Sequence, residues 1–168
     1  MLKRLITIIL LLLWSLSITG CSKEEQLLSP VAYYYLQVPM QFNGSDSVIH
    51  AEMREAAGFE NNFAYLLRVY LLGPNSSEYQ TPFPNDIKLV SLTYDDTTLV
   101  AVFSEEFATL FGLDLTLACV CFGRTAMELT GAPAVRIQTE RGLLNGKASI
   151  TIDHVSVHYF DDYYLQTE

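Results

Sequence analysis

Two segments with the hydrophobic period of a helix, each followed by a glycine, limit most strongly what this chain can fold into. In residues 62–72 the apolar side chains recur at i, i+3, i+4, i+7 and i+8, and Gly73-Pro74 follows directly. Residues 115–129 show a second such face, which stops before Gly131. A glycine can adopt the left-handed conformation of a helix cap, and a proline cannot continue a helix. The sequence therefore predicts two helices, each with an apolar face to bury.

Runs of β-branched and aromatic residues surround these helical segments and predict strands. They are residues 31–38, 48–54, 87–94, 98–103, 134–139 and 148–160. The short segment Asp95-Asp96-Thr97 joins two of them and predicts a hairpin. The order of strands and helices indicates the α+β class. We expect a two-layer sandwich in which both helices pack on one face of a mixed or antiparallel sheet of about four to six strands.

Short polar residues stand where the helical segments begin. Asn61 or Asn62 is expected to cap the first helix and Asp114 the second, because such a side chain can accept a backbone N–H of the first turn. Ser104, ahead of Glu105-Glu106, is expected to cap a short helical turn. A nucleophilic serine beside a carboxylate is the alternative, but no histidine is near in sequence and no Gly-x-Ser-x-Gly motif is present.

The first twenty residues have the composition of an export signal. Lys3 and Arg4 precede an apolar run, and small residues follow it. Residues 5–18 are fourteen residues long, whereas a membrane span needs about twenty. The ending Ile18-Thr19-Gly20-Cys21 resembles the lipobox of bacterial lipoproteins. This resemblance implies cleavage before Cys21, a lipid on its thiol, and anchoring at the extracytoplasmic face of the cell membrane. An ordinary secretory signal that happens to end at a cysteine is the alternative.

The composition indicates a folded and strongly acidic protein. Hydrophobic residues make up 50% of the 168 residues and charged residues 17%, which excludes disorder for most of the chain. Ten basic residues stand against nineteen acidic ones, for a net charge of −9. That charge argues against nucleic acid as a partner and against electrostatic docking on anionic lipid. Three cysteines cannot form a disulfide framework.

Several short motifs occur in an order that resembles the GerMN domain of bacterial sporulation and spore-germination lipoproteins. They are Leu71-Leu72-Gly73-Pro74, the strand-like residues 87–92, residues 99–107 with Ser104-Glu105-Glu106-Phe107, and Val135-Arg136-Ile137. The resemblance implies a fold like the ring-building modules of secretion and sporulation channels, a role in envelope assembly, and no catalytic residues. The expected parts are a signal peptide (1–20), a lipidated cysteine with its tether (21–30), a GerMN-like domain (31–142), and a C-terminal strand extension with an acidic tail (143–168).

Tyrosines gather near the two ends of the mature chain. They are Tyr33, Tyr34, Tyr35, Tyr159, Tyr163 and Tyr164. If the first and last strands are neighbours, these side chains form one aromatic patch, and tyrosine suits an interface because it buries area while keeping a polar tip. We therefore consider Tyr33, Tyr35, Tyr159 and Tyr163 as a partner interface. The alternative is ordinary strand packing with alternate tyrosines in the core.

Other reactive side chains give no pattern typical of catalysis or metal binding. His154 and His158 lie four apart on a predicted strand, about 13 Å from each other, which is too far to share one ion. Cys119 and Cys121 point to nearly opposite sides of a helix and cannot readily bridge. We expect a buried Cys119 and a partly exposed Cys121. No catalytic residue, metal or cofactor is predicted.

Taken together, these patterns predict a non-catalytic envelope lipoprotein that is anchored to the membrane through Cys21. It would act through contacts with other envelope proteins in sporulation or spore germination, a role that the family resemblance alone implies. A different class of function is a small-molecule-binding accessory lipoprotein of a membrane receptor or transporter. That alternative requires a concave pocket with a few convergent polar groups.

Overall fold

The structure is a computed structural model, and it describes residues 30–38, 48–56 and 58–157. Its helices are α2 (Phe63–Leu71) and α3 (Gly112–Thr130), with a 3₁₀ helix, η2 (Glu105–Thr109), between them. Its strands are β1 (Val31–Gln37), β2 (Ile49–Arg54), β3 (Tyr79–Gln80), β4 (Leu89–Asp95), β5 (Thr98–Phe103), β6 (Ala134–Thr139) and β7 (Ile150–Asp153). The two main helices and the principal strands therefore lie where the sequence predicts them.

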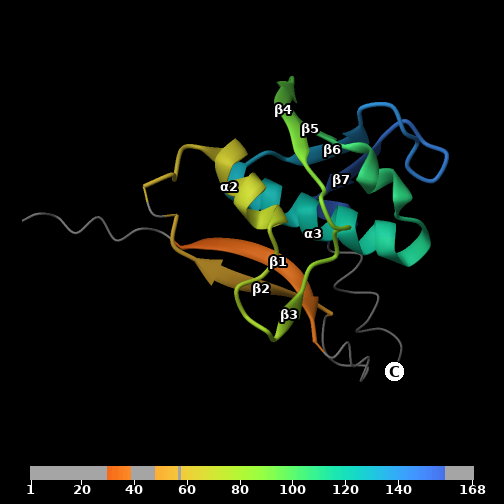
Figure 1. Cartoon of the computed structure of the whole chain (residues 1–168). Helices are drawn as coiled ribbons and strands as arrows, with labels where there is room; N and C mark the ends of the chain where they lie inside the picture. The colour runs from red at the N-terminus through yellow and green to blue at the C-terminus, as the bar shows by residue number, and fades with distance from the viewer. Residues whose placement is uncertain (1–29, 39–47, 57, 158–168) are drawn as a thin grey trace, which may run out of the picture.

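The strands divide between two sheets. One is antiparallel with the order β2-β1-β3, and the other is mixed with the order β4-β5-β6-β7, in which only the β5–β6 pair is parallel. Figure 1 shows α3 running between the two sheets, with β1 on one side and β6 and β7 on the other. The predicted α+β sandwich is confirmed, and the structure adds the small sheet on the far side of α3.

The position of α3 between two sheets explains its composition. Its buried residues run almost without a break from Leu115 to Met127, so the helix is covered on more than one face. Gly123 lies where β7 crosses, because a Cβ at this position would stand 2.6 Å from Cγ2 of Ile152. Gly131, with a φ of 71°, ends the helix in the left-handed conformation that the sequence predicts.

The ends of the helices show which capping predictions hold. The Asn62 side chain accepts the N–H of Tyr65 at 3.1 Å, as expected for the N-cap of α2. The cap predicted at Asp114 is wrong, because α3 begins earlier, at Gly112. Extended backbone at Phe111 forms its cap, so Asp114 lies inside the first turn.

The predicted hairpin is present, with Asp95 opposite Thr98 and Asp96 at a φ of 53°. The long strand prediction for residues 148–160 is wrong after Asp153, where residues 154–157 are helical. The Asp153 carboxylate accepts the N–H and the hydroxyl of Ser156 at 2.8 and 2.7 Å, which starts a helical turn and stops the strand.

Candidate interaction surfaces

The tyrosines of β1 lie in the core rather than on a surface patch. Tyr33 is 2% exposed and Tyr35 is 0% exposed. Their rings pack at 5.5 and 4.9 Å between centroids against Tyr70 of α2. The Tyr35 hydroxyl donates to the Tyr70 carbonyl at 2.8 Å, and the Tyr70 hydroxyl donates to the Tyr34 carbonyl at 2.5 Å. The core-packing alternative therefore describes Tyr33 and Tyr35, which join β1 to α2.

A buried ion pair completes this cluster. The Arg54 guanidinium lies over the rings of Tyr33 and Tyr35, at 5.0 and 5.4 Å from their centroids. It donates to the Glu52 carboxylate, with an Nε–Oε2 distance of 2.6 Å, and to the Gly73 carbonyl at 2.8 Å. Sequence reasoning missed this pair, although opposite charges two residues apart share one face of a strand and were a usable signal.

Glu52 also holds the segment that follows α2. Its carboxylate accepts the backbone N–H of Asn75 at 3.0 Å and that of Ser76 at 2.7 Å. Burial raises the pKa of Glu52, but the hydrogen bonds from Arg54, Ser76 and Asn75 lower it further, so the net pKa lies below its ordinary value. The charged form of Glu52 is therefore a structural element that ties β2 to the end of α2.

The opposite side of β1 contacts α3 through polar groups. The N–H of Tyr34 donates to the Thr125 hydroxyl at 3.0 Å, and the Tyr34 hydroxyl donates to Glu128 at 2.5 Å. The Arg124 guanidinium lies 4.3 Å from the centroid of the Tyr34 ring. All three tyrosines of β1 thus have defined partners within the fold.

Both described cysteines are buried, which corrects the expectation of a partly exposed Cys121. The reason is that α3 is covered by a sheet on each side. Burial raises the pKa of Cys119 to about 12 and raises that of Cys121 still further. Because the thiolate is the nucleophilic form, these thiols are poorly suited to react near neutral pH.

Ser104 stands at the N-cap position of η2, but its side chain makes no cap hydrogen bond. Its hydroxyl instead accepts the N–H of Lys88 at 3.0 Å, which joins the start of β4 to the end of β5. A hydrogen bond with Ser104 and, less strongly, the charge of Lys88 lower the pKa of Glu106. Glu105 accepts the N–H groups of Arg141 and Gly142 at 2.6 and 3.3 Å. These side chains therefore connect elements of the fold.

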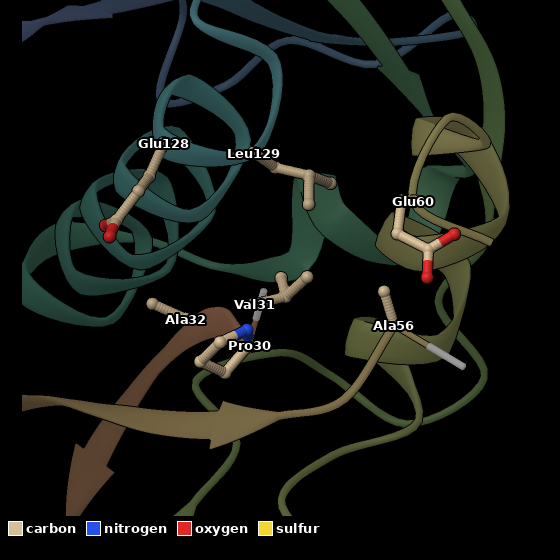
Figure 2. A pocket seen from close by; sticks show the side chains of 7 residues that line it. All are labelled: Pro30, Val31, Ala32, Ala56, Glu60, Glu128 and Leu129. Carbon is tan, nitrogen blue, oxygen red and sulfur yellow. The ribbon is translucent and has the colours of Figure 1, made fainter. Parts of the chain in front are cut away.

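A small hollow lies where β1 begins (Figure 2). It measures about 190 Å³ and is lined by Pro30, Val31, Ala32, Ala56, Glu60, Glu128 and Leu129. In Figure 2 the side chains of Val31 and Leu129 lie between the two glutamates. Pockets for small molecules typically measure about 300–1,000 Å³, so this hollow does not favour the small-molecule alternative.

A second hollow, of about 330 Å³ and so at the lower end of that range, lies between the end of α2 and the start of β4. Aliphatic side chains and two cations line it: Arg68, Leu71, Leu72, Ile87, Lys88 and Leu89. Leu72 is 85% exposed beside it. At the other end of β4 the side chain of Tyr94 is 54% exposed, so apolar groups reach solvent at both ends of this strand.

The lipidation candidate Cys21 and the interface candidates Tyr159 and Tyr163 lie outside the described part of the chain, as do Tyr164 and His158. Among the described residues, no three histidine, cysteine or acidic side chains are grouped as a metal site requires. No helix within those same ranges has the length and apolarity to cross a membrane.

The fold and its interior define the class of this protein as an α+β sandwich with a helix between two sheets. No protein-family model and no curated protein matches the chain. Solved structures similar to it include two that are described here. One is described as "Putative Lipoprotein from Clostridium perfringens", with 16% identity, a TM-score of 0.48, and coverage of 77% of this chain and 91% of that one.

The other similar structure holds the tandem GerMN domains of the sporulation protein GerM from Bacillus subtilis. Its identity is 17% and its TM-score 0.49, over 71% of this chain. This chain spans 40% of the length of that tandem structure.

Proposed function

We propose that this chain is a bacterial lipoprotein, anchored through Cys21 at the extracytoplasmic face of the membrane, which acts through protein contacts in envelope assembly during sporulation or germination. The ending Ile18-Thr19-Gly20-Cys21 supports the anchor, because a cysteine directly after a cleavable signal is the lipid acceptor in such proteins. Two or three acyl chains would hold the domain firmly at the bilayer, at about 0.8 kcal/mol per buried CH₂.

The single observation that carries a contact function is the contrast between the interior and the surface. The reactive groups that the sequence offered, such as Ser104 and Cys119, join or fill elements of the fold, and so does the buried Glu52. Apolar side chains instead gather at one hollow of the described surface, which is lined by Leu71, Leu72, Ile87 and Leu89 beside the edge strand β4, and there Leu72 is 85% exposed. An exposed apolar patch with charged residues at its rim is typical of a site that binds another protein.

The sequence motifs that support the sporulation proposal have structural roles in this fold. Gly73 donates its N–H to the Tyr70 carbonyl at 3.1 Å and so closes α2, and Phe107 is fully buried behind η2. Such motifs are typical of one type of domain because they supply its helix caps and its buried core residues. They support envelope assembly through the resemblance that they carry, and they require no catalytic group.

Metabolic labelling with a fatty acid tests the anchor in the native host. The full chain should incorporate label and remain with the membrane fraction. A Cys21→Ser variant should lose the label, whereas a Cys119→Ala control should keep it. Labelling that survives Cys21→Ser would contradict the proposed anchor.

Cross-linking in the same cells, followed by mass spectrometry, tests the contact function. We expect recovery of envelope proteins made during sporulation or germination, with recovery lost in the Cys21→Ser strain. Recovery of no envelope protein from cells at these stages would overturn the proposed role.

A further inference from the structure

Strand β4 forms one edge of the four-stranded sheet, and among the described residues no strand pairs with its outer side. It pairs only with β5 in the order β4-β5-β6-β7, and in the part of the chain that the structure describes no strand lies beyond it. Figure 1 shows the β4–β5 hairpin extending away from the rest of the fold. An edge strand offers a row of N–H and C=O groups to another chain unless charges, proline or a bulge prevent pairing.

Only part of this edge is protected against pairing with another strand. A bulge at Val90 interrupts the register between Leu89 and Ser91, but residues 91–95 pair regularly with β5. Leu92 and Tyr94 stand opposite Ala101 and Leu99, so they share the face of the sheet that carries the core. Five residues of regular, open strand therefore remain, with two apolar side chains on one face.

The charges along this strand have opposite signs at its two ends. Lys88 precedes β4, and Asp95 and Asp96 lie at the hairpin tip. Asp95 is paired at 2.7 Å with Arg136 of β6, the strand on the far side of β5. An antiparallel partner with the same sequence would bring the acidic tip of each copy to the basic start of the other, and a parallel partner would bring like charges together.

The hollow beside the start of β4 is complementary to the hairpin tip in charge and in apolar surface. Its aliphatic lining includes Leu71 and Leu89, and Arg68 and Lys88 supply two positive charges. The tip carries an exposed aromatic ring at Tyr94 and the carboxylate of Asp96. Each copy thus offers an apolar, basic hollow and an apolar, acidic tip, which is the self-complementarity that a two-fold interface requires.

We propose that two copies of this chain pair through β4 in antiparallel register about Thr93. In this register Leu92 of one copy faces Tyr94 of the other, and Thr93 faces Thr93 across the two-fold axis. Asp96 of each tip then lies beside the hollow that holds Arg68 and Lys88 of the second copy. The two four-stranded sheets become one continuous sheet of eight strands.

The opposite edge of the sheet does not offer the same partner surface. β7 has four residues, Ile150–Asp153, and the chain turns into a helix directly after it. Its exposed residue Thr151 stands opposite Arg136 of β6. The two edges therefore provide an internal comparison within one molecule.

Cysteine cross-linking of the full chain in cells tests this pairing. A Thr93→Cys variant places two thiols directly opposite each other, whereas a Thr151→Cys variant places an equally exposed thiol on the other edge. The wild-type chain serves as the background, because Cys119 and Cys121 are buried. Mild oxidation followed by non-reducing gels and mass measurement should show a disulfide-linked species of twice the chain mass for Thr93→Cys, several-fold above Thr151→Cys.

A charge reversal separates specific pairing from random collision. In the Thr93→Cys background, Lys88→Glu should lower the dimer yield about fivefold, since two symmetric attractions become repulsions. Lys147→Glu changes the net charge equally at an exposed turn and should leave the yield unchanged. Equal cross-linking at Thr93 and Thr151, equal effects of the two reversals, or a Thr93 product with a different protein would overturn the proposal. Each yield is counted as the excess over the wild-type chain, so a disulfide through an unlipidated Cys21 does not contribute to it.

Discussion

The two sheets that enclose α3 are held by different kinds of contact. The three-stranded sheet is joined to α2 by tyrosine hydroxyls and by the Glu52–Arg54 pair. The four-stranded sheet packs on α3 with apolar side chains such as Val135, Ile137 and Ile152. A polar network loses the most when one partner is removed, because the other partner stays buried without compensation. An apolar layer instead responds to changes in volume.

Removal of a large side chain from the apolar layer should have the largest effect. Phe103 of β5 is fully buried and packs on Phe107 and Phe122, with ring centroids 4.7 and 4.8 Å away. Phe103→Ala should lower the free energy of unfolding by about 3–5 kcal/mol. Phe111→Ala, at a ring that is 73% exposed, should change it by less than about 0.5 kcal/mol. Urea unfolding of both variants measures these free energies. Similar losses for the two variants would show that the apolar layer around Phe103 is not the core.

Removal of one charge from the polar network should give the second-largest loss in the free energy of unfolding. Glu52→Ala leaves Arg54 and the N–H groups of Asn75 and Ser76 without their acceptor. We expect a loss of about 3 kcal/mol in the free energy of unfolding. Glu55→Ala removes the same charge at an exposed position and should cost less than about 0.5 kcal/mol. Equal costs for the two variants would mean that the network contributes little.

Low pH should destabilise the two sheets unequally. This effect should be the smallest of the three predicted here. The pKa of Glu52 lies below its ordinary value of 4.5 in the folded chain, so its contribution is present above that value and is lost as pH falls through the folded pKa. The stability difference between wild type and Glu52→Ala should shrink below pH 4.5, while the Phe103→Ala difference stays constant. Unfolding curves at several pH values measure both, and a constant Glu52 difference would contradict the assignment.

The local features of this fold could be predicted from the sequence because neighbouring residues determine them. The periodicity of residues 62–72, the cap at Asn62 and the hairpin at Asp95-Asp96-Thr97 all depend on contacts within a few positions. The division into two sheets could not be predicted in this way, because β1 and β6 can each pair with several strands. Their distribution depends on which side of α3 each strand packs.

The candidate interaction residues show the same limit of prediction from sequence. Three consecutive tyrosines at positions 33–35 place aromatic rings on both faces of one strand, and such a strand is typically buried on both sides. That signal favours the core, yet the same residues suit an interface equally well by composition. Glu52 gave no sequence signal for its contacts with Asn75 and Ser76, because these N–H groups come from a distant turn.

The position of Pro30 has a mechanical consequence. The chain enters the described fold at the start of β1, which is the central strand of its sheet and is aligned with β2 from Val31 opposite Arg54 to Leu36 opposite Ile49. A pull on residue 30 along the axis of β1 loads these hydrogen bonds in shear, all at once, rather than opening them one after another. The hydrogen bonds from Tyr34 to Thr125 and Glu128 pass the same load into α3. The chain therefore resists traction at the strand through which a membrane tether would pull.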